Sequence, residues 1–406
     1  MLGCRKSGTL TSSRHFPDTS GLCRLCFPFC VLRSSRAKRW FVKLALAVAT
    51  SFAVLRAGFV QGLGWDQSRP VKVCTRVLEG SSGHGSDRAA RKLTINIKAA
   101  KSSNELIRLL GTATEDSYFN HFHASAAYHK LARFHRNRSF SQAPDLVLAK
   151  LHSRVQCMVE RNELDEQGSA NVLWGLAKFL DAGPEALKLI RSLASLIPRQ
   201  TSKMSPRDLS NCLWAAAQLE DLEPSVLKMV PAIIAKIAST GGKTNLQDVA
   251  NNLDALVSLQ GSVAEVGPLL APGQSGSFLR RAADRLNRGL PQLQGTDLYM
   301  NMPSVVWACA RSGLHDHPLF VSVAERFTSS AQPSKLPDWD LCALAWAYQV
   351  VDLEKSFEDF QQALELEINR RGFSASKVES SKVGSSRWGR ASVWRSEVAL
   401  RLQLFR

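Results

Sequence analysis

One short phrase recurs along the chain, and its spacing constrains the fold more than any other feature. In its best copies, Asn is followed three positions later by Trp and then by small and apolar residues. The copies read NVLWGLAKFL from Asn171, NCLWAAAQLE from Asn211, NNLDALVSLQ from Asn251, SVVWACARSG from Ser304 and ALAWAY from Ala343. Three of the four intervals between Trp positions span 39 or 40 residues, and a weaker copy has Tyr128 in place of the Trp. Self-similarity at this period predicts a repeat architecture.

Each repeat is predicted to hold two helices, the second of which carries the phrase. Ser205 suits a helix N-cap, Pro206 the first helical turn, and Asp208 the third position, where a carboxylate faces the positive end of the helix. The apolar residues that follow recur with helical spacing. The companion helices are expected at residues 145–159, 184–197, 224–239, 277–289, 318–329 and 355–371. Two prolines, Pro231 and Pro303, predict a kink or a break because each removes a backbone donor.

These features predict an all-α chain folded as an α-solenoid of helix-pair repeats of about 40 residues. A single pair cannot bury its apolar faces, whereas stacked pairs share one core. The repeat array is expected at residues 101–371, with a loop insertion at the Gly-, Pro- and Ser-rich residues 261–276. The structural anchors are predicted to be Trp174, Trp214, Trp307 and Trp346, which act as core wedges beside small residues such as Gly175. Base stacking is the alternative role for these rings.

The net charge of +17 points at first to a nucleic-acid binder, but its distribution changes that reading. Residues 1–100 carry a net charge of +13, residues 370–406 carry +7, and residues 101–369 carry −3. The total charge therefore says little about the repeat array. It favours a targeting leader at residues 1–100 and a basic C-terminal tail at residues 372–406.

The leader is expected to be largely disordered apart from an apolar helix at residues 41–60. Its uncharged stretch, residues 44–55, would rise only about 18 Å as a helix, which suits a signal-type segment better than a membrane span. The following basic region and Phe59 resemble the bipartite leader of proteins imported into complex plastids. A plastid location is therefore favoured, with a mitochondrial presequence as the alternative. A retained membrane anchor and an incorrect start codon also stay open, and a membrane is a partner only through an uncleaved leader.

The phrase Asn-x-Leu-Trp-Ala-x-Ala-x-Leu, preceded by Ser/Thr-Pro-x-Asp-Leu, resembles the octotricopeptide repeat of organellar RNA-binding proteins. It is also similar to the leucine-rich repeats of FAST-kinase-like mitochondrial RNA proteins. The resemblance covers roughly residues 121–371 and is strongest around Trp214. It implies binding of single-stranded organellar RNA, and a role in RNA processing, stability, splicing or translation, alongside other organellar RNA-processing proteins. Two departures are Asp254 in a Trp position and the lack of the RAP domain pattern in residues 372–406.

Candidate RNA-binding residues are cations that gather near the array or stand at helix starts, because phosphate contacts need such side chains. They are Lys130, Arg133, Arg136 and Arg138 in one patch, Arg280, Arg281, Arg285 and Arg288 in a second, and Lys203, Arg207 and Lys243 singly. An ordinary solvated helix face is the alternative for each patch.

No constellation in the sequence predicts catalysis, so the chain is not expected to be an enzyme or to hold a cofactor or metal. Cys23 and Cys26 form a CxxC without a second ligand pair, and Cys157, Cys212, Cys309 and Cys342 are expected to be small core residues. A cluster of His121, His123, His129 and His135 predicts a solvated surface.

Two other classes of protein remain open. A protein–protein interaction scaffold of the HEAT or armadillo type, without RNA binding, fits the net charge of −3 in the array. A degenerate fragment of a larger gene fits Asp254 and the absent terminal domain.

Overall fold

A computed structural model describes residues 84–136, 145–179, 183–239, 244–351 and 356–372. The chain divides into two units, residues 1–71 and 72–406, and every described residue belongs to the second. The predicted apolar helix at residues 41–60 lies outside the described residues. So do most of the predicted leader and the predicted tail beyond residue 372.

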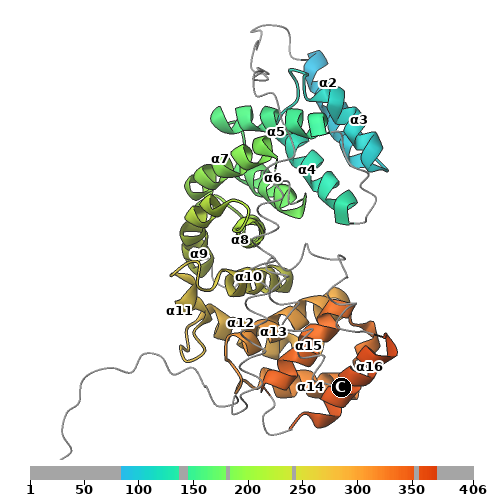
Figure 1. The fold of residues 1–406 in the computed structure, drawn as a ribbon, viewed down its shortest axis with the longest axis vertical. Coiled ribbons are helices and arrows are strands. Elements are labelled where there is room, and N and C mark those ends of the chain that lie inside the picture. Colours follow the sequence, from blue (N-terminus) through green and yellow to red (C-terminus); the bar gives the residue numbers. More distant parts are fainter. Residues whose placement is uncertain (1–83, 137–144, 180–182, 240–243, 352–355, 373–406) are drawn as a thin grey trace, which may run out of the picture. The chain divides into compact units, whose positions relative to one another are not determined.

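The described residues form α-helices and no β-strand, which confirms the all-α class (Figure 1). The fifteen α-helices are α2 (His84–Ala99), α3 (Ser103–Ala113), α4 (His121–Arg136), α5 (Asp145–Glu160), α6 (Glu166–Phe179), α7 (Pro184–Gln200), α8 (Pro206–Leu219), α9 (Val230–Ser239), α10 (Leu246–Leu259), α11 (Val266–Leu270), α12 (Phe278–Gly289), α13 (Met302–Arg311), α14 (Leu319–Ser329), α15 (Asp338–Val351) and α16 (Glu358–Arg370). The companion helices fall within a few residues of where the sequence predicts them, except that the helix predicted at 224–239 divides into a 3-10 helix, Pro224–Met229, and α9.

The helices stack in two rows. Row A consists of α2, α4, α6, α8, α10, α13 and α15, and each of these helices contacts the next. Row B is formed by the companion helices: α3, α5, α7 and the 3-10 helix η1 (Pro224–Met229) follow one another, as do α12, α14 and α16. Contacts between successive helices of the same row confirm the predicted solenoid.

The start of α8 shows why these segments become helices. The Ser205 hydroxyl accepts from the Asp208 N–H at 3.3 Å, and the Asp208 carboxylate accepts from the Ser205 N–H at 3.2 Å. This reciprocal capping box satisfies backbone donors that the helix itself leaves unpaired. Asn245 caps α10 through the Asp248 N–H at 2.7 Å. The N-cap predicted at Ser205 is confirmed.

Row A packs through its Trp positions and the small residues beside them. Trp214, Trp307 and Trp346 are 4%, 4% and 5% exposed, and the rings of Trp307 and Trp346 lie 6.4 Å apart on successive row A helices. A Cβ on Gly175 would stand 2.8 Å from Tyr128 Cβ, so α4 and α6 approach each other more closely than any larger residue allows. Three of the four Trp rings therefore lie in the core.

The array begins earlier than predicted, and the leader boundary at residue 100 is corrected. Helix α2, which falls inside the predicted leader, packs on α4 and buries Leu93 and Ile97. Its basic composition drew the assignment to a leader, although Leu93, Ile97 and Ala100 already show helical apolar spacing. Helix α2 is thus a row A helix without the Trp phrase, and α3 is its companion.

Both prolines that conflicted with the helical pattern mark element boundaries. Pro231 is the second residue of α9, directly after η1, and Pro303 is the second residue of α13, after the π-helical segment η3 (Asp297–Asn301). At each proline the helix changes type, from 3-10 to α before Pro231 and from π to α before Pro303, which is the break in the regular pattern that a missing backbone donor predicts. The predicted loop insertion at residues 261–276 contains the short helix α11.

Candidate nucleic-acid interface

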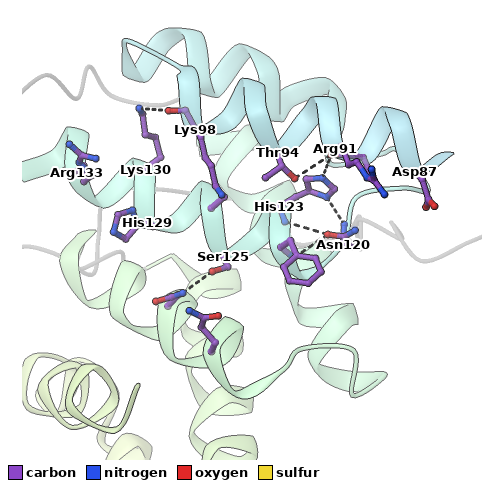
Figure 2. A pocket seen from close by; sticks show the side chains of 15 residues that line it. Asp87, Arg91, Thr94, Lys98, Asn120, His123, Ser125, His129, Lys130 and Arg133 are labelled. Atoms are coloured by element: carbon purple, nitrogen blue, oxygen red, sulfur yellow. Dashed lines mark hydrogen bonds between the residues drawn. The ribbon is translucent and has the colours of Figure 1, made fainter. Parts of the chain in front are cut away.

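An open pocket of about 820 Å³ lies at the N-terminal end of row A, on α2, α4 and α6 (Figure 2). Its lining is basic, polar and aromatic: Asp87, Ala90, Arg91, Thr94, Lys98, Asn120, Phe122, His123, Ser125, Ala126, His129, Lys130, Arg133, Gln167 and Asn171. Four Lys or Arg side chains line this pocket against one carboxylate. We call it the row A pocket.

Two hydrogen bonds fix the register of its walls. The His123 imidazole bonds the Ala90 carbonyl through Nε2 at 2.8 Å, and the Lys130 ammonium donates to the Lys98 carbonyl at 2.8 Å. Residue numbers rise together in these pairs, so α2 and α4 run in the same direction. The pocket consequently has two ends, one near Asn120 and one near Arg133.

One end is strongly cationic. Figure 2 shows Lys98, Lys130 and Arg133 toward this end. Lys98 and Arg133 are exposed and Lys130 is half-buried, with its ammonium 5.3 Å from the centre of the Phe134 ring. None of the residues that line this end is acidic. Three cations from two helices give this end a local positive charge of the kind that attracts phosphate, although the array as a whole is not basic.

The other end combines amide, aromatic and oppositely charged groups. Asp87 and Arg91 lie here, one helical turn apart on α2 (Figure 2). The Asn120 side-chain oxygen Oδ1 accepts from the Phe122 N–H at 3.1 Å and so caps the start of α4. The Phe122 side chain remains 60% exposed. An exposed aromatic ring in a pocket that also holds cations is the combination that stacks a nucleobase and holds its phosphate.

His123 belongs to the framework of this end. Only 1% of its surface is exposed, so the sequence-based prediction of a solvated His cluster is wrong at this position. The Asn120 N–H donates to Nδ1 at 3.0 Å, which requires that Nε2 carry the proton given to the Ala90 carbonyl. Burial lowers the pKa of His123, and the neighbouring His121 adds to this effect against the Ala90 hydrogen bond. The ring is therefore neutral at pH 7 and locks α2 onto α4.

Helix α6 supplies a wall of amides. Gln167 is exposed, and Asn171 is half-buried with its amide donating to the Ser125 hydroxyl at 2.8 Å. The same repeat position holds Asn211 on α8 and Asn251 on α10, each also half-buried. Half-buried amides at equivalent positions thus continue from the row A pocket onto the next two helices of row A.

Trp174 differs from the other Trp anchors because it is half-buried beside the pocket. The pocket residue His129 stacks on its ring at a centroid distance of 5.6 Å. The Lys178 ammonium lies 5.4 Å from the same ring and 3.8 Å from the ring of Trp214. A cation held between two indole rings links α6 to α8.

The other predicted cations lie elsewhere. Arg280 donates to the Pro272 carbonyl at 3.2 and 3.3 Å and Arg281 donates to the Gly276 carbonyl, so both fasten the insertion to α12. Arg285 donates to the Thr244 hydroxyl at 3.2 Å, whereas Arg288 is exposed. A role of these four residues in RNA binding stays a prediction.

The single candidates occupy less favourable surroundings for phosphate. Lys203 is exposed but lines a smaller pocket, of about 420 Å³, with the carboxylates of Glu163, Asp165 and Glu166. Arg207 is exposed on α8 near Asp248, whose pKa burial raises and Arg207 lowers. The side chain of Arg136 and the whole of Arg138 and Lys243 lie outside the described residues.

Of the residues that line the row A pocket, Lys130 and Arg133 are predicted from the sequence as candidate RNA-binding residues. Arg91, Lys98 and Phe122 are not. The predicted leader spans residues 1–100 and includes Arg91 and Lys98, so the sequence does not mark them as part of the array. A signal was present, because Asp87, Arg91, Thr94 and Lys98 are spaced 4, 3 and 4 residues apart and so share one helical face.

Three of the four described cysteines are buried, and burial disfavours their thiolate form. Burial raises the pKa of Cys309 and of Cys342 to about 12, and raises that of Cys212 still further. Within the described ranges no three His, Cys, Asp or Glu side chains lie where they could share a metal ion. No helix among the described residues has the length and apolar character to cross a membrane.

The chain matches no protein-family model and none of the curated proteins compared with it.

Proposed function

We propose that this chain is an organellar helical-repeat protein that binds single-stranded RNA at the row A pocket. Acting there, it protects, processes, splices or activates translation of a transcript, together with other organellar RNA-processing proteins. The row A pocket carries the proposal, since four cations, an exposed Phe ring and several amides meet there on an array that is otherwise slightly acidic. The resemblance of the Trp phrase to the octotricopeptide repeat supports the choice of RNA.

The physical logic rests on how single strands are held. Phosphates require Lys and Arg, unstacked bases require aromatic faces, and base edges require amide or similar groups. The row A pocket offers Lys98 and Arg133 for the first, Phe122 for the second and Gln167 for the third. The half-buried amides on α8 and α10 extend this polar surface along row A.

A salt series tests the proposal. Binding of fluorescently labelled single-stranded organellar RNA to the full chain would be followed by anisotropy from about 50 mM salt upward. Each phosphate contact on a single strand contributes about −0.7 to the slope of log K against log salt, so four cations predict a slope near −3. Replacing Lys98, Lys130 and Arg133 by Gln should flatten that slope by about 2.

A matched variant separates the pocket from the total charge. Lys228, Arg199 and Lys335 are exposed cations on η1, α7 and the 3-10 helix η4 (Pro333–Lys335), away from the row A pocket. Replacing these three by Gln removes the same charge and should leave affinity and slope nearly unchanged. Equal losses in both triple variants would refute the pocket, and no binding at about 50 mM salt would refute RNA binding.

A protein-interaction scaffold is the second candidate. The net charge of −3 in residues 101–369 favours it, and so does the use of Arg280 and Arg281 to hold the insertion. Absence of RNA binding would leave this candidate standing. The organellar location rests on the leader alone, with the plastid favoured over the mitochondrion. A reporter fused to residues 1–83, which precede α2, tests it: a cytosolic signal would refute the location.

A further inference from the structure

The two ends of the row A pocket differ chemically, so a ligand that fills the pocket should carry two different chemical groups. Ala90 and Lys98, the two residues of α2 that fix the register with α4, are eight residues apart, which is about 12 Å along a helix. Over that distance the lining changes from an end with Phe122 and amide groups to an end where Lys98, Lys130 and Arg133 lie together with His129.

The aromatic end carries almost no net charge. Asp87 and Arg91 offset each other, and His123 is held neutral because Nδ1 accepts from Asn120 while burial opposes its protonation. The Asn120 side-chain oxygen accepts from the Phe122 and His123 N–H groups, so the hydrogen-bonding group that this lining residue has left to offer is its NH₂ donor. An amide donor and the exposed Phe122 ring suit an uncharged planar group with polar edges.

The cationic end suits a phosphate instead. Lys130 uses one of its three N–H donors on the Lys98 carbonyl, which fixes the ammonium and leaves two donors for a ligand. Lys98 and Arg133 approach the same end from α2 and α4 (Figure 2). No acidic lining residue competes there.

We propose that the row A pocket binds one nucleotide as a unit, with its base on Phe122 and its phosphate between Lys98, Lys130 and Arg133. This inference rests on the proposed function, since the nucleotide is one residue of the bound RNA. It adds the orientation of the nucleotide in the pocket, with the base toward Asn120 and the phosphate toward Arg133. A free nucleoside monophosphate carries the same two groups and should occupy the same site.

Competition against labelled single-stranded RNA tests this with the full chain. The competitors are the four nucleoside 5′-monophosphates, the matching nucleosides and inorganic phosphate, all at one ionic strength. Monophosphates should displace the RNA at concentrations at least about tenfold lower than nucleosides or phosphate, because only they engage both ends. Displacement by phosphate at the same concentration as the monophosphates would overturn the inference and leave a simple anion site.

Two variants measure how much each end of the row A pocket contributes to the affinity for a nucleoside monophosphate. Phe122→Leu keeps an apolar side chain at an exposed position, so the fold is retained, and should weaken the monophosphates about tenfold while leaving phosphate unchanged. Arg133→Gln should weaken monophosphates and phosphate together and leave nucleosides unchanged. Val321→Ala, which changes another exposed apolar residue on α14, serves as the control. Loss of phosphate binding in Phe122→Leu would contradict the proposed direction.

The two proposals fail in different ways. If RNA binds with the expected salt slope and no monophosphate displaces it, the single-nucleotide site is wrong and RNA binding stands. Direct titration calorimetry with the monophosphates covers the reverse case. Monophosphate binding without RNA binding would refute the proposed function and support a nucleotide site with two chemically different ends.

Discussion

The close approach of α4 and α6 at Gly175 allows a quantitative test of how the row A pocket is built. A Cβ added at Gly175 would lie 2.8 Å from Tyr128 Cβ, 3.1 Å from its Cδ1 and 3.2 Å from its backbone oxygen. Tyr128 has no room to move, because it is fully buried and its hydroxyl bonds His152 Nδ1 at 2.5 Å. Gly175→Ala therefore has to push the two helices apart.

The expected free-energy change combines two opposing effects. Overpacking a tight contact costs about 1–3 kcal/mol, whereas Ala is favoured over Gly in a helix by about 1 kcal/mol. Gly175→Ala should thus lower the free energy of unfolding by up to about 2 kcal/mol. Gly111→Ala is the matched control, since its Cβ meets only Val147 Cγ2, at an ordinary 3.7 Å. That variant should be neutral or slightly stabilised.

Urea unfolding followed by circular dichroism measures both variants under identical conditions. The difference between them, about 1–3 kcal/mol, isolates the steric cost from the helix propensity. Gly175→Ala should also weaken RNA binding, because Gln167 and Asn171 would shift relative to α4. Equal stability of the two variants would refute the idea that α4 and α6 are held at contact distance by a glycine.

Further predictions concern titration, capping and thiol reactivity. Burial lowers the pKa of His123 in the folded protein, so the unfolded chain takes up a proton at higher pH than the folded chain does. The free energy of unfolding should therefore fall as pH drops below about 6.5. His123→Gln should reduce this fall, which urea unfolding midpoints measured from pH 7 to 5.5 would show. Ser205→Ala removes the capping box and should cost about 1 kcal/mol in urea unfolding, with Ser202→Ala, at an exposed turn position, as the control. Cys212 and Cys309 are both buried, so they should resist alkylation in the native protein and react in urea, as detected by mass spectrometry. Rapid alkylation of either residue in the native protein would contradict its burial.

Much of the fold was predictable because the signals that define it are local. Ser205, Pro206 and Asp208 begin α8 through contacts within four residues, and the apolar spacing that follows needs no distant partner. Pro231 and Pro303 predict a kink or a break from their missing backbone donors, and the structure places each where one helix type changes to another. The site was harder to predict, since composition suggested a leader where Leu93 and Ile97 of α2 pack into the array.

The sequence by itself determined that this chain is a stack of helix pairs, and roughly where each helix begins and ends. Capping and helical periodicity act over a few residues and repeat every 40, so they can be read without the fold. Only the tertiary structure decided which polar groups meet. Ala90 and His123 are joined across α2 and α4, and Lys98 and Lys130 likewise, because two helices pack in one register. That register brings cations from α2 and α4, which are scattered along a nearly neutral array, together in one basic pocket.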